Sequence, residues 1–228
     1  MAALEAQRRA ARDAGERRTA VFWTTLGWLH QEQPARALQA FQANLAGSVQ
    51  DAALHAANLF IVAEIQLHAG QVDAALATLG EVDAALARAT AAPEGVREAL
   101  RRNRLHLTAW AEAAGGDRAA AQRDAAAFRA QAEASGQRLE RQRADLLDGV
   151  VALTAGDGAR AVAALAPLDE GDPEVEALRA RALEAAGDRA AAREAWRRAA
   201  EYRGVQFALS WAFVRAEAVR ALDRLGAT

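Results

Sequence analysis

Few side chains in this sequence of 228 residues are of a type and at a spacing that could carry out chemistry. It contains no Cys, which excludes disulfides, thiolate zinc sites and a Cys nucleophile. The histidines form neither a His-Glu-x-x-His motif nor a close pair, so the sequence predicts no metal site. They are His30, His55, His68 and His106. The serines lie outside any Gly-x-Ser-x-Gly elbow, and we therefore expect a protein that is not an enzyme. They are Ser48, Ser135 and Ser210.

One glycine pair invites a cofactor hypothesis. Gly156-Asp-Gly158, with Ala161 three residues later, formally matches a dinucleotide fingerprint and follows the apolar run Val150–Leu153. A functional fingerprint needs a preceding strand within a βαβ unit. Because no other segment supplies a partner strand, the pattern favours two helices joined by a turn, and we predict no cofactor.

The charged residues favour a solvated surface. Carboxylates alternate with arginines along the predicted helices, as Glu184 and Asp188 do with Arg193 and Arg197. Arg101–Arg104 is the densest basic cluster, and its pattern favours the polar side of a long helix over an anchor for a carboxylate or phosphate. The net charge of −2 gives no electrostatic case for nucleic acid or an anionic membrane as partner.

The composition predicts an all-α protein. The chain is 52% hydrophobic but only 5% aromatic, has abundant Ala and contains four Pro. Ala is the strongest helix former, and segments rich in the β-branched and aromatic residues of strands are nearly absent. There is no apolar run long enough for a membrane span and no signal-peptide pattern, so we expect no membrane association and a cytoplasmic location.

The segment Ala185–Tyr202 shows how the helices are organised. Gly187-Asp188 forms a predicted turn, with apolar residues at helical spacing before it and Ala192, Trp196 and Ala199 after it. Two amphipathic helices joined by so short a turn must lie antiparallel. Similar turns at Gly70, Gly116 and Gly156 predict a series of such pairs. The predicted pairs span 19–47, 51–89, 94–134, 137–168 and 173–203, with an exposed helix over 2–14 and a capping helix over 205–225.

The motifs within these pairs resemble the tetratricopeptide repeat (TPR) family. Trp23-x2-Leu26-Gly27-x2-His30 matches the family's first helix, with His where Tyr is usual, and Ala37-x3-Phe41 matches its second helix. Ala192-x3-Trp196 after Gly187 is the best match to the second helix. The resemblance implies one domain over 1–228. That domain would be a right-handed α-solenoid, a TPR-like superhelix of antiparallel helical hairpins with terminal capping helices.

The resemblance also implies a peptide-binding groove along the first helices of the pairs. The candidate groove residues are Phe60, Glu64, Asn103, His106, Trp110, Leu146 and Val150. The alternative, that Phe60 and Trp110 are ordinary core, is favoured by their helical spacing. The family's clamp for C-terminal carboxylates uses Lys and Asn. The chain has no Lys, and Phe60 and Glu64 stand at the clamp's first positions, so we expect no chaperone-type clamp.

These patterns predict a non-catalytic scaffold or adaptor that binds a protein or peptide on the concave face of a helical-repeat solenoid. A first alternative is an assembly protein that forms a homodimer or larger homo-oligomer through its apolar ends. The residues considered for that role are Phe22, Trp23, Phe207 and Trp211. A second alternative is the sensory domain of a peptide-responsive regulator, although the segment 2–14 is too short for the DNA-binding unit that such regulators carry.

Overall fold

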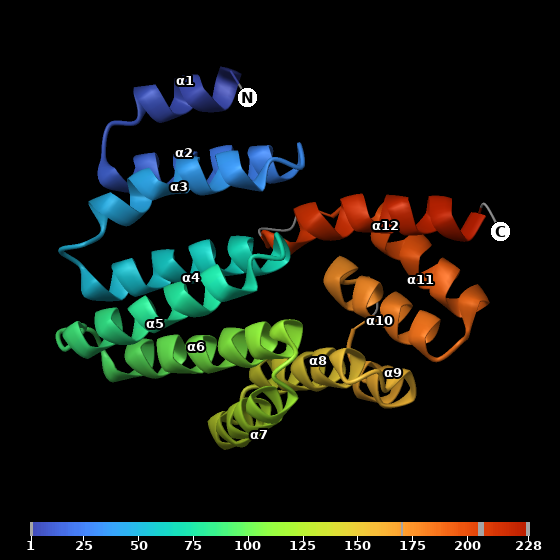
Figure 1. Cartoon of the computed structure of the whole chain (residues 1–228). Coiled ribbons are helices and arrows are strands. Elements are labelled where there is room, and N and C mark those ends of the chain that lie inside the picture. The colour runs from blue at the N-terminus through green and yellow to red at the C-terminus, as the bar shows by residue number, and fades with distance from the viewer. Residues whose placement is uncertain (1, 170, 205–207, 227–228) are drawn as a thin grey trace. The chain divides into compact units, whose positions relative to one another are not determined.

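The computed structural model describes residues 2–169, 171–204 and 208–226, and in these ranges it contains twelve α-helices and no strand (Figure 1). The predicted all-α class is therefore confirmed for the part of the chain described. The chain divides into two compact units, residues 1–101 and 102–228, and the boundary falls within helix α6. No helix in the described residues is both long enough and apolar enough to cross a bilayer.

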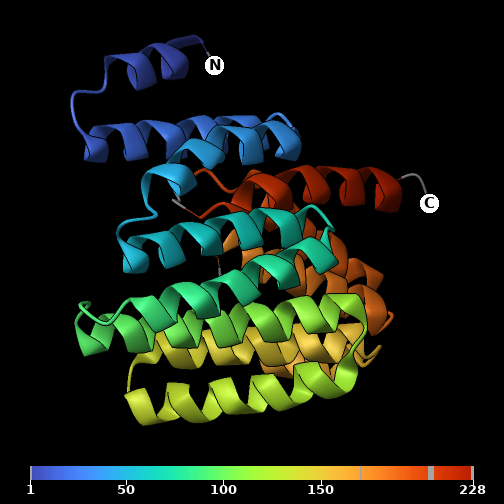
Figure 2. The same ribbon diagram turned by 60° about the vertical axis from the view of Figure 1, so that its left-hand side comes forward.

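The N-terminal unit contains five helices and the first part of a sixth. They are α1 (Ala2–Ala10), α2 (Ala14–Leu29), α3 (Pro34–Gly47), α4 (Ala52–His68), α5 (Val72–Arg88) and α6 (Glu94–Gly115). From α1 to α5, each helix packs against the next in chain order, and Figure 2 shows α4 and α5 lying side by side. The expected N-terminal boundaries were wrong. Helix α1 ends at Ala10 and α2 begins at Ala14, because the carboxylate of Asp13 caps α2 by accepting a hydrogen bond from the Glu16 amide at 2.8 Å.

The C-terminal unit contains the rest of α6 and six further helices. They are α7 (Arg118–Ser135), α8 (Arg138–Thr154), α9 (Gly158–Leu165), α10 (Pro173–Ala185), α11 (Arg189–Glu201) and α12 (Ser210–Gly226). Consecutive helices from α7 to α12 pack against each other, and α10 also contacts both α8 and α12. A helix was predicted over 205–225, and α12 is helical from Ser210 onward; residues 205–207 lie outside the described residues.

Five turns between paired helices share one backbone geometry. One residue in each adopts the left-handed conformation: Glu32 with φ 55°, and Gly70, Gly116, Gly156 and Gly187 with φ between 76° and 89°. In each turn the amide of the following residue donates to the carbonyl five residues before it, at 2.8–3.0 Å. This bond is the signature of the Schellman motif, which satisfies the carbonyls at a helix C-terminus. The turn at Glu32 therefore repeats the glycine turns without a glycine.

After each of these five turns, the buried residues of the following helix fall at the same positions. The fifth residue after each left-handed residue is an Ala with 0% exposure, and these are Ala37, Ala75, Ala121, Ala161 and Ala192. The ninth residue is also buried, with an exposure of 4% or less; these are Phe41, Leu79, Ala125, Leu165 and Trp196. A methyl side chain allows close approach of the paired helix, and the residue one turn later fills the adjoining space. The sequence predicted this arrangement for Ala192 and Trp196, and it is confirmed there.

The segment Gly156–Gly158 joins two helices, as predicted, and the helix α8 stands where a dinucleotide fingerprint would need a strand. Gly156 supplies the left-handed conformation of the turn, with φ 81°. Gly158 has a different role. A Cβ atom on it would lie 2.5 Å from the backbone nitrogen of Ala186, so its absence allows α9 to begin against the C-terminal end of α10. Gly156 is thus explained by the turn conformation and Gly158 by helix packing.

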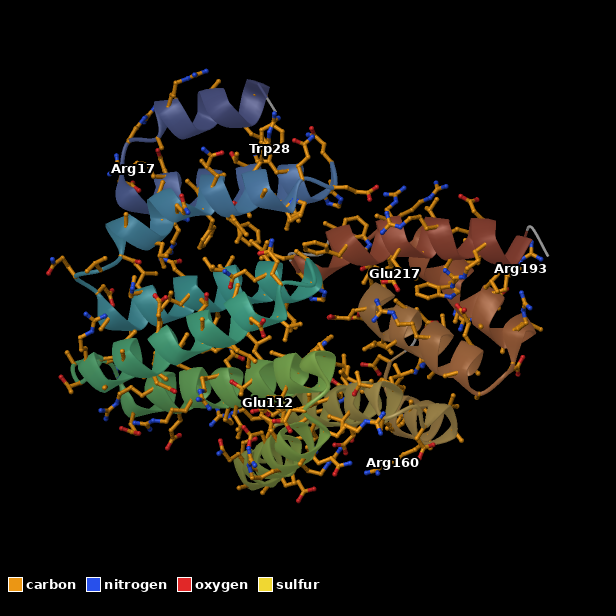
Figure 3. All side chains as sticks on the ribbon, in the orientation of Figure 1. Arg17, Trp28, Glu112, Arg160, Arg193 and Glu217 are labelled. Carbon is orange, nitrogen blue, oxygen red and sulfur yellow. The ribbon has the colours of Figure 1, made fainter. Side chains whose placement is uncertain are left out.

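Ion pairs join the last three helices. Glu176 of α10 has a fully buried side chain and accepts hydrogen bonds from Arg179 at 2.7 Å and from Arg198 of α11 at 2.8 Å. Arg181 of α10 pairs with Glu217 of α12, which Figure 3 labels. A buried carboxylate is tolerated only when it is paired in this way.

Two carboxylates expected to carry solvated surface charge also have structural roles. Glu184 accepts a hydrogen bond from the indole Nε1 of Trp196, and it pairs with Arg224 of α12 at 3.0 Å. Asp188 caps α11 by accepting from the Ala191 amide at 3.0 Å. Asp188 is exposed and Glu184 partly exposed, in keeping with surface charge, but the alternating pattern does not show which carboxylates lie at a helix start or face an indole.

Candidate binding surface

The candidate groove residues are divided between the two units. Phe60 and Glu64 lie on α4 in the N-terminal unit, four residues apart and so on one face of that helix. Phe60 is only 5% exposed, whereas Glu64 is partly exposed. Of these two, Glu64 therefore presents the larger fraction of its side chain to a ligand.

The face of α6 that carries the next candidates combines buried and partly exposed residues. Asn103 and Trp110 are partly exposed, whereas His106 is 5% exposed. The His106 ring packs against Trp110, with centroids 5.9 Å apart, and against Phe128 of α7, with centroids 5.0 Å apart. His106 is thus a buried residue that packs beneath the neighbouring aromatic rings, whereas Asn103 and Trp110 are partly accessible to solvent.

Helix α8 brings the last two candidates to the same hydrophobic cluster as Trp110. Val150 is 4% exposed and belongs to the buried part of this cluster, while Leu146 and Trp110 pack against it and stay partly exposed. Trp110, Leu146 and Val150 are therefore brought together in the C-terminal unit. The accessible edge of this cluster, Trp110 with Leu146, together with Asn103, is called the Trp110 edge below.

The environment of His106 excludes acid–base work near neutral pH. Burial, together with the positive charge of Arg143, lowers the pKa of His106 to about 3, so the imidazole is neutral. Its Nδ1 atom is buried and has no hydrogen-bond partner among the described residues. Such an unsatisfied nitrogen costs stability, and a further proton would cost more.

The basic cluster Arg101–Arg104 forms ion pairs with carboxylates of its own chain. Arg101 donates to Glu94 at 2.9 Å, and this hydrogen bond is the largest cause of the lowered pKa of Glu94. The side chain of Arg102 lies 4.0 Å from Glu140. Since these two guanidinium groups already face carboxylates, the structure favours the helix-surface interpretation over an anchor for an external anion.

A Ser–His contact that the sequence did not indicate lies in the N-terminal unit. The Oγ atom of Ser48 is 3.1 Å from Nδ1 of His55, and it donates a hydrogen bond to the Leu45 carbonyl at 2.8 Å. A hydroxyl has one proton, and here that proton has a carbonyl partner, so the contact is not that of an activated nucleophile. No local motif joins residues 48 and 55, and only the turn between α3 and α4 brings them together.

Three of the residues considered for self-association, Phe22, Trp23 and Trp211, are partly exposed. Phe22 and Trp23 of α2 pack edge to face, with ring centroids 5.8 Å apart. Trp211 of α12 packs in the same way on Tyr202, also at 5.8 Å. Phe207 lies outside the described residues.

Comparison of the chain with protein-family models, with curated proteins and with solved structures finds no match. Within the described ranges there is also no group of three or more His, Cys, Asp or Glu side chains that could hold a metal ion. The function of the chain is therefore inferred from its own packing and surface.

Proposed function

We propose that the chain is a right-handed solenoid of antiparallel helical hairpins, similar to the TPR family, that binds a segment of another protein. The support for the repeat is the shared turn geometry, with a buried Ala five residues after each left-handed residue. The contacts of α10 with α8 and α12 add to this, because in a stack of hairpins each first helix touches the first helix of the next unit.

The observation that carries the binding proposal is the Trp110 edge. It offers an indole and an aliphatic side chain that pack on a buried cluster, with the amide of Asn103 two turns before Trp110 on α6. Aromatic side chains with a partly exposed face on a rigid base are the usual anchors of protein–protein interfaces, and a nearby amide can bond to a peptide backbone. The partner is therefore a polypeptide with an apolar side chain beside a free backbone amide or carbonyl. The role is that of a non-catalytic adaptor.

The test compares retention of partner proteins by two single variants. Trp110→Ala removes the proposed anchor, whereas Leu139→Ala removes an apolar side chain of α8 that is 65% exposed and lies outside the cluster. Each protein is immobilised and the proteins it retains from cells that express it naturally are quantified by mass spectrometry. We expect a discrete partner retained by the wild type and by Leu139→Ala and depleted with Trp110→Ala. Equal retention by all three proteins would contradict the assignment of the Trp110 edge.

A further inference from the structure

The N-terminal unit contains a cavity of about 330 Å³ where α2, α3 and α4 meet. It is lined by two arginines, Arg17 and Arg18, by polar side chains of α3 and α4, and by small residues such as Gly47. The lining contains no carboxylate. A concave lining whose charged groups are all positive attracts an anion, and the cavity walls concentrate that field.

The two arginines differ from those of the chain that pair with a carboxylate. Arg129, Arg138 and Arg181, for example, each pair with a carboxylate of the protein. Arg17 and Arg18 have no such ion pair among the described residues, and both side chains are exposed beside the cavity. Figure 3 labels Arg17 near the N-terminal end of α2. Their guanidinium groups therefore keep all their side-chain donors for a ligand, and Arg can bind an oxyanion with two parallel hydrogen bonds.

The opposite wall of the cavity is polar and held in place. Asn58 is 3% exposed, and its Nδ2 donates to the Asn44 carbonyl at 3.2 Å. The side-chain Nδ2 of Asn44 in turn donates to the backbone carbonyl of Arg18 at 3.3 Å, and this bond joins α3 to α2. Each of these bonds uses one of the two hydrogens on its amide nitrogen, so each Asn keeps a second donor. Fixed amide donors together with two arginine side chains around a small cavity are suited to an anion with several oxygen atoms.

We propose that this cavity binds a small molecule that carries a carboxylate or phosphate group. The volume lies at the lower end of the range for small-molecule sites, so it fits a compact metabolite and not a length of peptide. The site is separate from the predicted groove. Asn58 lines the cavity, and Phe60 follows it by two residues, which places Phe60 about 200° further around α4.

The test is calorimetric titration of the full chain at low ionic strength, where screening is weakest. The probes are glutarate, inorganic phosphate and the uncharged diamide of glutarate. We expect binding of at least one of the two anions and none of the diamide. Which anion binds more tightly tells whether a carboxylate or a phosphate group is preferred. Binding of neither anion, or equal binding of the diamide, would overturn the proposal.

Two kinds of variant show whether binding occurs at this cavity. The double variant Arg17→Gln/Arg18→Gln should weaken anion binding roughly tenfold or more, because each lost bond to a charged group is substantial. Arg88→Gln, which removes an exposed arginine of α5 elsewhere in the same unit, should leave it unchanged. Ala43→Glu places a carboxylate at the exposed rim of the cavity and should abolish binding. Unchanged affinity in the double variant or in Ala43→Glu would refute the site.

Discussion

Glu32 allows the shared turn geometry to be tested by substitution. It holds the left-handed conformation with φ 55°, at the position where four other turns have Gly. A residue with a Cβ atom loses about 1–2 kcal/mol in that conformation. Glycine avoids this loss but gives up about 0.5–1 kcal/mol through the greater entropy of the unfolded chain. We therefore expect Glu32→Gly to be more stable than Glu32→Ala by about 1 kcal/mol.

The comparison with Glu32→Ala is the matched control, because both variants lose the same glutamate side chain and its contacts. The free energy of unfolding is measured by urea denaturation followed by circular dichroism. The reciprocal change, Gly187→Ala, should cost about 1 kcal/mol for backbone reasons alone, since a Cβ atom at Gly187 would meet no atom within 4 Å. If Glu32→Gly is no more stable than Glu32→Ala, the left-handed turn is not a common structural element of the five pairs.

Three further predictions concern packing, titration and capping. Trp196→Ala should cost about 3–5 kcal/mol in urea denaturation, because the indole is 1% exposed; Trp110→Ala should cost clearly less, and equal losses would make both residues core. Between about pH 7.5 and about pH 5.5 the folded protein should lose about 1.4 kcal/mol through His106, because the unfolded chain takes up a proton near its ordinary pKa and the folded chain does not. His106→Leu should remove that part of the pH dependence of the unfolding free energy. If the pH dependence is unchanged in this variant, His106 takes up its proton at the same pH in the folded and the unfolded chain. Asp188→Ala should cost about 1 kcal/mol, since it removes the N-cap of α11, and a change near zero would show that water replaces the cap.

Much of the secondary structure was predictable because its signals are local. Asp51 is of a residue type that favours the N-cap, and its carboxylate accepts a hydrogen bond from the Leu54 amide at 3.0 Å at the start of α4. Pro34 lies at the first position of α3, where its missing N–H costs no helical hydrogen bond. Such signals act within one turn of helix, so a short window of sequence contains them.

The features that sequence reasoning missed depend on residues distant in the chain or on unusual conformations. A Glu in the sequence does not predict a left-handed turn, since Gly or Asn usually occupies that position. Trp110 and Trp196 both stand at helical spacing in apolar stripes, yet Trp110 lies partly exposed at the margin of its hydrophobic cluster, whereas Trp196 is buried within another. The cavity beside Arg17 needs α2, α3 and α4 together, and no single segment indicates it.

The most direct measurement of the binding proposal is site-specific photo-crosslinking in cells that express the protein naturally. A photoreactive amino acid replaces Asn103 at the Trp110 edge in one variant, and Arg193 of α11 in the other. Arg193 is exposed and is labelled in Figure 3. We predict a discrete covalent adduct with another polypeptide at position 103 and none at position 193. No adduct at position 103, or the same adducts at both positions, would contradict a polypeptide-binding surface on this face.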